Sequence, residues 1–253
     1  MPYKGLSATK IARAVGCHPN TVRLYEAWGL LPPVQRNEVG YRLYTPVHLA
    51  QMQLARRALN SQWPGRAIRR SAMALVKTSA VGDLEYARQL AFQHREIVQD
   101  ELAMAEEAAH TLEDWAQRRS IAADQPPVMI GAAARLLGVS IDMLRNWEAN
   151  GLVSIPRDPG NRYRWYGPAE IDRLRIIRML RSAGYSPMAI LRMLIRFDQG
   201  QTHGLRDVLD TPAPDEDIFM AADRWLTTLT DQADRAEELI LLLEDRIAAE
   251  NTA

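Results

Sequence analysis

Residues 21–30 read TVRLYEAWGL, and residues 143–152 read MLRNWEANGL. These two stretches lie 122 positions apart (21 to 143), and the match extends without a gap over about 65 residues. It pairs Arg23, Glu26, Gly29, Leu30, Tyr41, Arg42, Tyr44 and Pro46 with Arg145, Glu148, Gly151, Leu152, Tyr163, Arg164, Tyr166 and Pro168. An internal repeat of this length predicts that the chain contains one structural unit twice.

Length and composition are typical of a soluble protein with two domains. The chain has 253 residues, of which 47% are hydrophobic and 25% charged. No run approaches the roughly 18 apolar residues of a membrane span, and the N-terminus lacks the apolar segment of a signal peptide. We therefore expect no membrane partner and a cytoplasmic, nucleoid-associated location. The single cysteine, Cys17, excludes an intramolecular disulfide, and we expect no metal site and no cofactor.

Charge is segregated along the chain although its net value is zero. Counting Lys and Arg against Asp and Glu, residues 1–80 hold 12 and 2, and residues 81–125 hold 4 and 10. Residues 126–206 hold 12 and 6, and residues 207–253 hold 3 and 13. Each repeat thus has a basic block followed by an acidic one. This pattern is typical of a part that faces phosphates followed by a part that faces solvent or a partner helix.

Each basic block begins with two short helices and a tight turn. In the first copy Thr9 is the expected N-cap, Gly16 suits a left-handed C-cap, and Pro19 fits the first position of a helix ending near Trp28. In the second copy Ser140 is the expected N-cap, with Met143 and Leu144 as core positions. A mere helical hairpin is the alternative for one copy, but two copies favour a helix-turn-helix.

The helical pattern stops between Leu31 and Tyr44, where prolines, Asn37 and Gly40 predict a small β-hairpin, or wing. A cap followed by proline, Thr45-Pro46 in the first copy, then begins a third helix. Its counterpart is Gly167-Pro168. Fourth helices are expected from about Pro64 and from Ser186-Pro187, each preceded by an aromatic core residue, Trp63 or Tyr185.

A long acidic segment with an apolar seam follows each module. From Phe219 to Ile247, apolar residues recur at alternating steps of three and four, which predicts a coiled coil. The segment at 83–119 has the same rhythm, although His94 and Glu101 interrupt it. We expect His94 to be a solvated seam defect rather than part of a pH-sensitive or ligand-binding notch. The predicted boundaries are 1–82 (head 1), 83–119 (coil helix), 120–127 (linker), 128–198 (head 2), 199–216 (loop) and 217–250 (coil helix).

The predicted fold class is therefore mainly α, with two winged helix-turn-helix domains, each followed by a long coiled-coil helix. We expect the two coil helices to pair antiparallel within one chain, as an intramolecular pseudo-dimer. Self-association between the coils of two chains is the open alternative.

Candidate DNA contacts lie on the second helix and on the wing of each head, because helix-turn-helix proteins insert the start of that helix into the major groove. In head 1 they are His18, Asn20, Thr21, Arg23, Arg36, Arg42 and Tyr44. In head 2 they are Ser140, Asp142, Arg145, Asn146, Arg157, Arg162, Arg164 and Tyr166. The arginines could instead form ion pairs with Glu26 or Glu148. The two sets differ, so two non-identical half-sites are expected.

The run Val22-Arg23-Leu24-Tyr25-Glu26, followed by Gly29-Leu30-Leu31-Pro32-Pro33 and Gly40-Tyr41-Arg42-Leu43-Tyr44, resembles the DNA-binding domain of MerR-family transcriptional regulators. The second copy is similar but has Asn146-Trp147 at a usual tyrosine pair and Arg162 at the wing glycine. The resemblance implies double-stranded DNA and RNA polymerase as partners, and distortion of promoter DNA. It names no small-molecule effector for this chain.

Other classes of function are weaker. No phosphate loop, nucleophile elbow or clustered carboxylate set appears, so we do not expect an enzyme. An architectural or excisionase-like protein that bends DNA without activating transcription is the main alternative. A protein interaction module acting through the coils is a third class.

Overall fold

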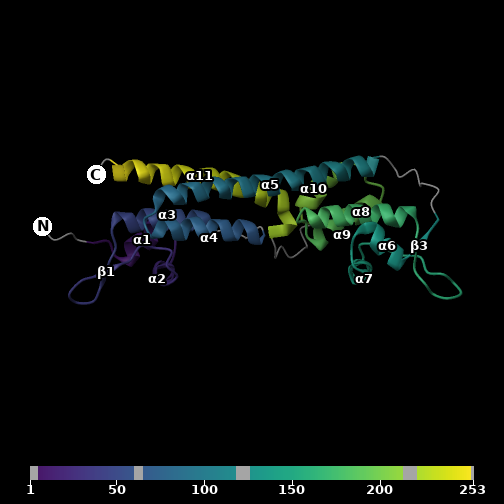
Figure 1. Cartoon of the computed structure of the whole chain (residues 1–253), viewed down its shortest axis with the longest axis horizontal. Coiled ribbons are helices and arrows are strands. Elements are labelled where there is room, and N and C mark those ends of the chain that lie inside the picture. Colours follow the sequence, from purple (N-terminus) through teal and green to yellow (C-terminus); the bar gives the residue numbers. More distant parts are fainter. Residues whose placement is uncertain (1–4, 60–64, 118–125, 213–220, 252–253) are drawn as a thin grey trace. The chain divides into compact units, whose positions relative to one another are not determined.

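The computed structural model of the protein describes residues 5–59, 65–117, 126–212 and 221–251. It divides into two compact units: Met1–Asp100 with Leu229–Ala253 form unit 1, and Glu101–Thr228 form unit 2. The mainly helical fold is confirmed (Figure 1). The expected linker at 120–127 and coil start at 217–220 fall largely outside the described residues, as do Trp63, Pro64 and Phe219.

Head 1 begins with the expected helix-turn-helix. The helices are α1 (Ala8–Ala14) and α2 (Pro19–Ala27). Ser7, not Thr9, is the N-cap of α1, because its hydroxyl accepts the Lys10 backbone N–H at 3.3 Å. Pro19 occupies the first turn of α2, as predicted, and Gly16 has the left-handed φ of 62° that the turn requires.

A short hairpin and two longer helices complete head 1. Strands β1 (Gln35–Arg36) and β2 (Arg42–Leu43) pair antiparallel and form the wing. Helices α3 (Pro46–Leu59) and α4 (Arg66–Ala80) follow. His48 fixes the start of α3, since its Nδ1 accepts the Thr45 backbone N–H at 3.0 Å.

Head 2 repeats this plan within unit 2. Its elements are β3 (Val128–Met129), α6 (Ile130–Leu137), α7 (Ile141–Ala149), β4 (Trp165–Tyr166), α8 (Pro168–Ser182) and α9 (Pro187–Asp198). Strands β3 and β4 pair antiparallel, matching the bridge between Leu6 and Tyr44 in head 1. Ser140 caps α7 as predicted, but Met143 is exposed rather than a core residue.

The second wing keeps the same bend with different residues. Arg162 has a φ of 63°, in the left-handed region where Gly40 has 86°. In the first wing, the backbone N–H of Asn37 donates to the Tyr41 carbonyl. The equivalent residue of the second wing is Pro159, which has no backbone N–H to donate. Asp158 donates to the Tyr163 carbonyl instead, at 2.8 Å, so the strand pairing shifts by one residue.

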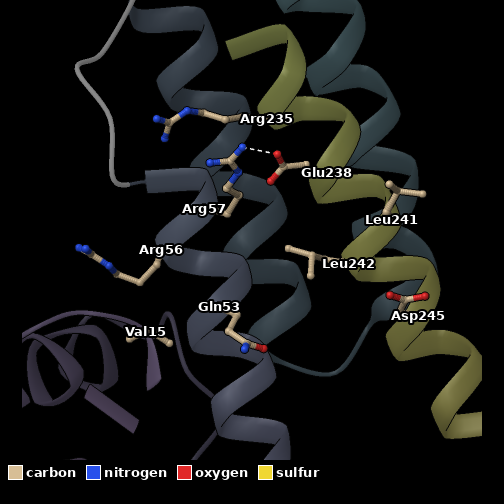
Figure 2. A pocket seen from close by; sticks show the side chains of 9 residues that line it. All are labelled: Val15, Gln53, Arg56, Arg57, Arg235, Glu238, Leu241, Leu242 and Asp245. Carbon is tan, nitrogen blue, oxygen red and sulfur yellow. Dashed lines mark hydrogen bonds and ion pairs between the residues drawn. The ribbon is translucent and has the colours of Figure 1, made fainter. Parts of the chain in front are cut away.

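The predicted coil segments are long helices, α5 (Leu84–Gln117) and α11 (Trp225–Asn251). In unit 1 the first half of α5 runs antiparallel to α11 (Figure 1). Their seam residues share one core with head 1, formed on the coil side by Leu84, Ala87, Ala91, Leu239, Ile240 and Leu243. Arg57 of α3 forms an ion pair with Glu238 of α11 beside Leu241 and Leu242 (Figure 2).

His94 contradicts the sequence expectation of a solvated seam defect. Its side chain is 2% exposed, and its Nδ1 lies 2.7 Å from the Ser71 hydroxyl of α4. Burial lowers the pKa of His94 to about 4, so the ring is neutral near pH 7. The seam accepts histidine because a serine hydroxyl provides its polar partner.

In unit 2 the second half of α5 packs on head 2. Tyr185 is fully buried and donates its hydroxyl to the Ala105 carbonyl at 3.0 Å, which confirms its expected core role. The segment expected as a loop after head 2 instead contains α10 (Leu205–Asp210), which packs against α9. The 3-10 turn η1 (Ala221–Arg224) leads into α11. Within the described ranges, no helix is long and apolar enough to cross a membrane.

Candidate nucleic-acid interface

The start of α2 presents an exposed polar cluster in head 1. His18 caps the helix, since its Nδ1 accepts the Asn20 backbone N–H at 3.2 Å. The Asn20 side-chain oxygen in turn accepts a hydrogen bond from Arg23 at 3.1 Å. Thr21 is half-buried beside them. Polar donors and a cation at a helix N-terminus, where the helix dipole is positive, suit contact with phosphates and base edges.

Head 2 has the same layout with different chemistry. The Ser140 hydroxyl caps α7 by accepting the Met143 backbone N–H at 3.1 Å. Asp142, at the position of Asn20, accepts a hydrogen bond from Arg145 at 3.2 Å. Asn146 is held by Asn150, whose amide donates to the Asn146 backbone and side-chain oxygens at 2.7 and 3.1 Å. The helix cap and the arginine of head 1 therefore recur in head 2, but the carboxylate of Asp142 replaces the amide of Asn20.

The outer faces of the two second helices differ in a way that sequence reasoning missed. Leu24 of α2 and its C-cap residue Trp28 are 44% and 56% exposed. They stand at the positions of Asn146 in α7 and of its C-cap residue Asn150. The Trp28 ring stacks on Tyr25, with 6.2 Å between centroids. Aligning the two copies residue by residue would have found this contrast. Head 1 therefore presents an apolar surface where head 2 presents amides.

A carboxylate holds the base of the wing in head 1. Glu26 of α2 accepts hydrogen bonds from Arg42 Nε at 2.7 Å and from the Tyr44 hydroxyl at 3.0 Å. Burial, and then the bond to Glu26, raise the pKa of Tyr44 to about 12, so Tyr44 stays protonated and donates. Glu26 thus connects α2 to the base of the wing.

Head 2 uses two arginines at the equivalent place. Glu148 of α7 pairs with Arg164 Nε at 2.6 Å and with Arg157 at 3.5 Å. The Tyr166 hydroxyl is buried and has no hydrogen-bond partner among the described residues. Arg157 stands at the position of Gln35, so the second copy replaces a tyrosine hydroxyl by a guanidinium as the second donor to the carboxylate.

The two wing tyrosines lie differently from the sequence expectation. Tyr44 is 0% and Tyr166 is 1% exposed, so neither hydroxyl faces solvent, and the expected direct contact with phosphate does not fit this structure. The physical reason is that both rings pack into the core of their heads. Arg42 and Arg164 make the ion pairs considered as their alternative role, and each keeps part of its side chain exposed.

The wing tips present further cations. Arg36 is exposed and donates to the Gly40 carbonyl at 3.0 Å, which fixes the turn of the first wing. Arg162 is exposed at the tip of the second wing. The Asp158 carboxylate accepts the backbone N–H groups of Asn161 and Gly160, which lowers the pKa of Asp158 and orders that tip.

Cys17 lies half-buried in the turn between α1 and α2. Burial raises the pKa of its thiol, with the nearby Arg56 opposing part of this rise. In the described part of the chain, no group of three or more His, Cys, Asp and Glu side chains is placed to hold a metal ion.

Comparison with known proteins finds the same module twice. The family model described as MerR HTH family regulatory protein matches residues 6–73 and 128–195. The transcriptional regulator HmrR of Sinorhizobium medicae is 38% identical over 65 residues, which are 26% of this chain and 44% of that protein. The mercuric resistance operon regulatory protein of Serratia marcescens is 34% identical over 74 residues, or 29% and 50%.

The transcriptional regulator CueR of Escherichia coli is 38% identical over 53 residues, covering 21% of this chain and 39% of CueR. The chain thus spans half or less of the length of these curated relatives. No solved structure matches the chain.

Proposed function

The chain belongs to the MerR HTH family of regulatory proteins, and from that premise we propose that it is a sequence-specific regulator of transcription that binds double-stranded DNA. The relatives named above support this, since two are called transcriptional regulators and one an operon regulatory protein. Their similarity covers half or less of each relative, so the partners and activity of the whole protein are part of the proposal.

The observation that carries the proposal is the repeated polar N-terminus of the second helix, joined to a wing by a carboxylate. Arg23 and Arg145 are exposed in the first two turns of α2 and α7, each held by the residue three positions earlier. Glu26 and Glu148 fix the wings relative to these helices. Cationic side chains held in place on a helix and a wing can contact the phosphates of a DNA duplex and position the protein on it.

We propose that the two heads read two different half-sites. Asn20 and Asp142 occupy equivalent positions, and an amide can bind adenine whereas a carboxylate accepts from cytosine. At two further equivalent positions, head 1 has the exposed Leu24 and Trp28, whereas head 2 has Asn146 and Asn150. An operator without two-fold symmetry follows from this difference. We further propose that binding distorts promoter DNA for RNA polymerase.

Genomic fragments bound by the full chain would define the operator, and point variants would then test the assignment. Arg23→Ala and Arg145→Ala should each weaken binding and lower the salt slope by about 1, because each removes one phosphate contact. Arg88→Ala is the matched control, since Arg88 is an equally charged side chain on α5. Unchanged affinity in both head variants would contradict the interface.

A second candidate function is an architectural protein that bends DNA without activating transcription. The same interface favours both, so the discriminating measurement is a run-off transcription assay on the selected operator. Increased transcript on adding the protein supports a regulator that acts with RNA polymerase. Bending of the fragment in a gel-shift assay with no change in transcript supports the architectural alternative.

A further inference from the structure

Unit 2 contains a cavity that the DNA interface does not use. It has a volume of about 390 Å³ and lies where the end of α5 meets head 2. Trp115 of α5 and Phe197 of α9 form one wall, with ring centroids 4.5 Å apart and planes inclined by 33°. The volume falls within the range of small-molecule sites. The other lining residues are Gly151, Val153, Ser154, Ala169, Glu170, Asp172, Arg173 and Asp198.

The charged groups of this cavity favour a cation. Three carboxylates and one guanidinium line it, and two of the carboxylates pair with arginines: Asp198 with Arg173, and Asp172 with Arg175 at 2.8 Å. Arg173 binds both oxygens of Asp198 at 2.6 and 2.9 Å and donates Nε to the Leu152 carbonyl at 2.8 Å. Glu170 accepts only the Gly167 backbone N–H, at 2.9 Å, and forms no ion pair within the described residues. An anion in the cavity would therefore lie near the Glu170 carboxylate, while the Arg173 guanidinium already binds Asp198.

Head 1 lacks this chemistry at the equivalent positions. Gln51 stands at the position of Arg173 and donates to the Leu30 and Val76 carbonyls, both at 3.0 Å. Arg246 of α11 then covers Gln51 and Ser79, with hydrogen bonds of 2.6 and 2.7 Å. In head 1 the positions of Glu170, Asp172 and Phe197 hold His48, Ala50 and Leu75. The acidic, aromatic lining is thus particular to head 2.

We propose that the cavity in unit 2 binds a small, flat aromatic cation. The ring of such a ligand packs against Trp115 and Phe197, and its positive charge faces Glu170. Cation–π attraction and a carboxylate together select a cation over a neutral or anionic ring. This inference does not depend on DNA binding. The groove of unit 1 in Figure 2 has no aromatic residue among its described lining residues, and its Arg57 and Glu238 already pair with each other.

Calorimetric titration of the full chain with N-methylquinolinium tests the proposal, with quinoline and 2-naphthoate as neutral and anionic ligands of similar shape. We expect saturable binding of the cation at one site, weaker binding of quinoline and none of 2-naphthoate. Tryptophan fluorescence should be quenched in parallel, and the Trp115→Phe variant should bind with little of that quenching. Equal binding of 2-naphthoate, or no saturable binding of the cation, would overturn the proposal.

Substitution of the carboxylate gives the sharpest test. Glu170→Gln keeps an acceptor for the Gly167 N–H but removes the charge, and should raise the Kd about tenfold. Glu107→Gln removes an exposed carboxylate of α5 in the same unit that neither lines the cavity nor belongs to the proposed DNA interface, and should leave the Kd unchanged. An unchanged Kd in Glu170→Gln would contradict the site. DNA binding by the same preparations is measured separately, so either proposal can fail alone.

Discussion

At the scale of single residues, the repeat allows the same position to be compared in two environments. The clearest case is the pair of buried wing tyrosines. Tyr44 donates to Glu26 at 3.0 Å, whereas the Tyr166 hydroxyl has no hydrogen-bond partner in the part of the chain that the structure describes. A hydrogen bond to a charged group contributes more to stability than one between neutral groups, and an unpaired buried hydroxyl costs free energy. Two chemically identical substitutions should therefore have different effects.

Tyr44→Phe should lower the free energy of unfolding by about 1–3 kcal/mol, because it removes a hydrogen bond to a carboxylate. Tyr166→Phe should be neutral or stabilising, because it removes a hydroxyl that has no partner. Urea unfolding of the two variants beside the parent chain checks this. Equal destabilisation by both would show that Tyr166 has a partner the structure does not contain.

Arg162 allows backbone strain to be separated from charge. Its φ of 63° is unfavourable for a residue with a Cβ, by roughly 1–2 kcal/mol. Arg162→Gly should therefore raise the unfolding free energy by about 1 kcal/mol, while Arg162→Ala should not. Both variants lose the guanidinium, so their DNA affinities should fall by the same factor. A lower free energy of unfolding for Arg162→Gly than for the parent chain would contradict the assigned backbone strain.

At the scale of elements, one buried titratable group, His94 of α5, lies at the contact between α5 and α4 and makes its stability sensitive to pH. His94 is buried neutral, with its pKa lowered from 6.5 to about 4. Between these values the unfolded chain binds a proton that the folded chain does not, so stability falls as the pH falls through this window. The full effect is about 3 kcal/mol. Stability above pH 6.5 is unaffected by this group.

His94→Gln should flatten this pH dependence, because glutamine can still bond to the Ser71 hydroxyl but does not titrate. Unfolding free energies at pH 7 and pH 4.5 are compared for the parent and the variant. We expect a smaller loss on acidification in the variant. His203→Gln, a substitution at an exposed histidine in unit 2, serves as the control and should behave like the parent. Identical pH profiles for parent and His94→Gln would exclude His94 as the source.

At the scale of the whole molecule, one chain contains two heads, and α5 contributes to both compact units. Two reading heads in a single chain remove the need for a second copy on the DNA. We therefore expect a complex with one chain per selected operator fragment, measured as mass in solution by light scattering. Two chains per fragment would instead support pairing of coils between chains.

The sequence by itself determined the doubled module, the positions of most helix starts and the buried seam of the coil helices. These features depend on local rules: caps and prolines act within a few residues, and helical periodicity marks which face is apolar. The predictions of Thr9 as the N-cap of α1 and of Met143 as a core residue were wrong, because the ends and faces of a short helix offer little periodic signal. Only the tertiary structure decided which distant groups meet.

Glu26 meets Tyr44 across 18 residues, Ser71 meets His94 across 23, and Arg246 meets Gln51 across 195. Such contacts make Tyr44, an expected phosphate donor, a buried partner of Glu26, and make His94, expected to be solvated, a core residue. The cavity beside Trp115 in unit 2 is likewise a product of tertiary packing, because no local sequence pattern reveals which side chains line a space between packed helices. Burial and pairing are properties of the packed chain, and they fix the chemistry that each residue retains.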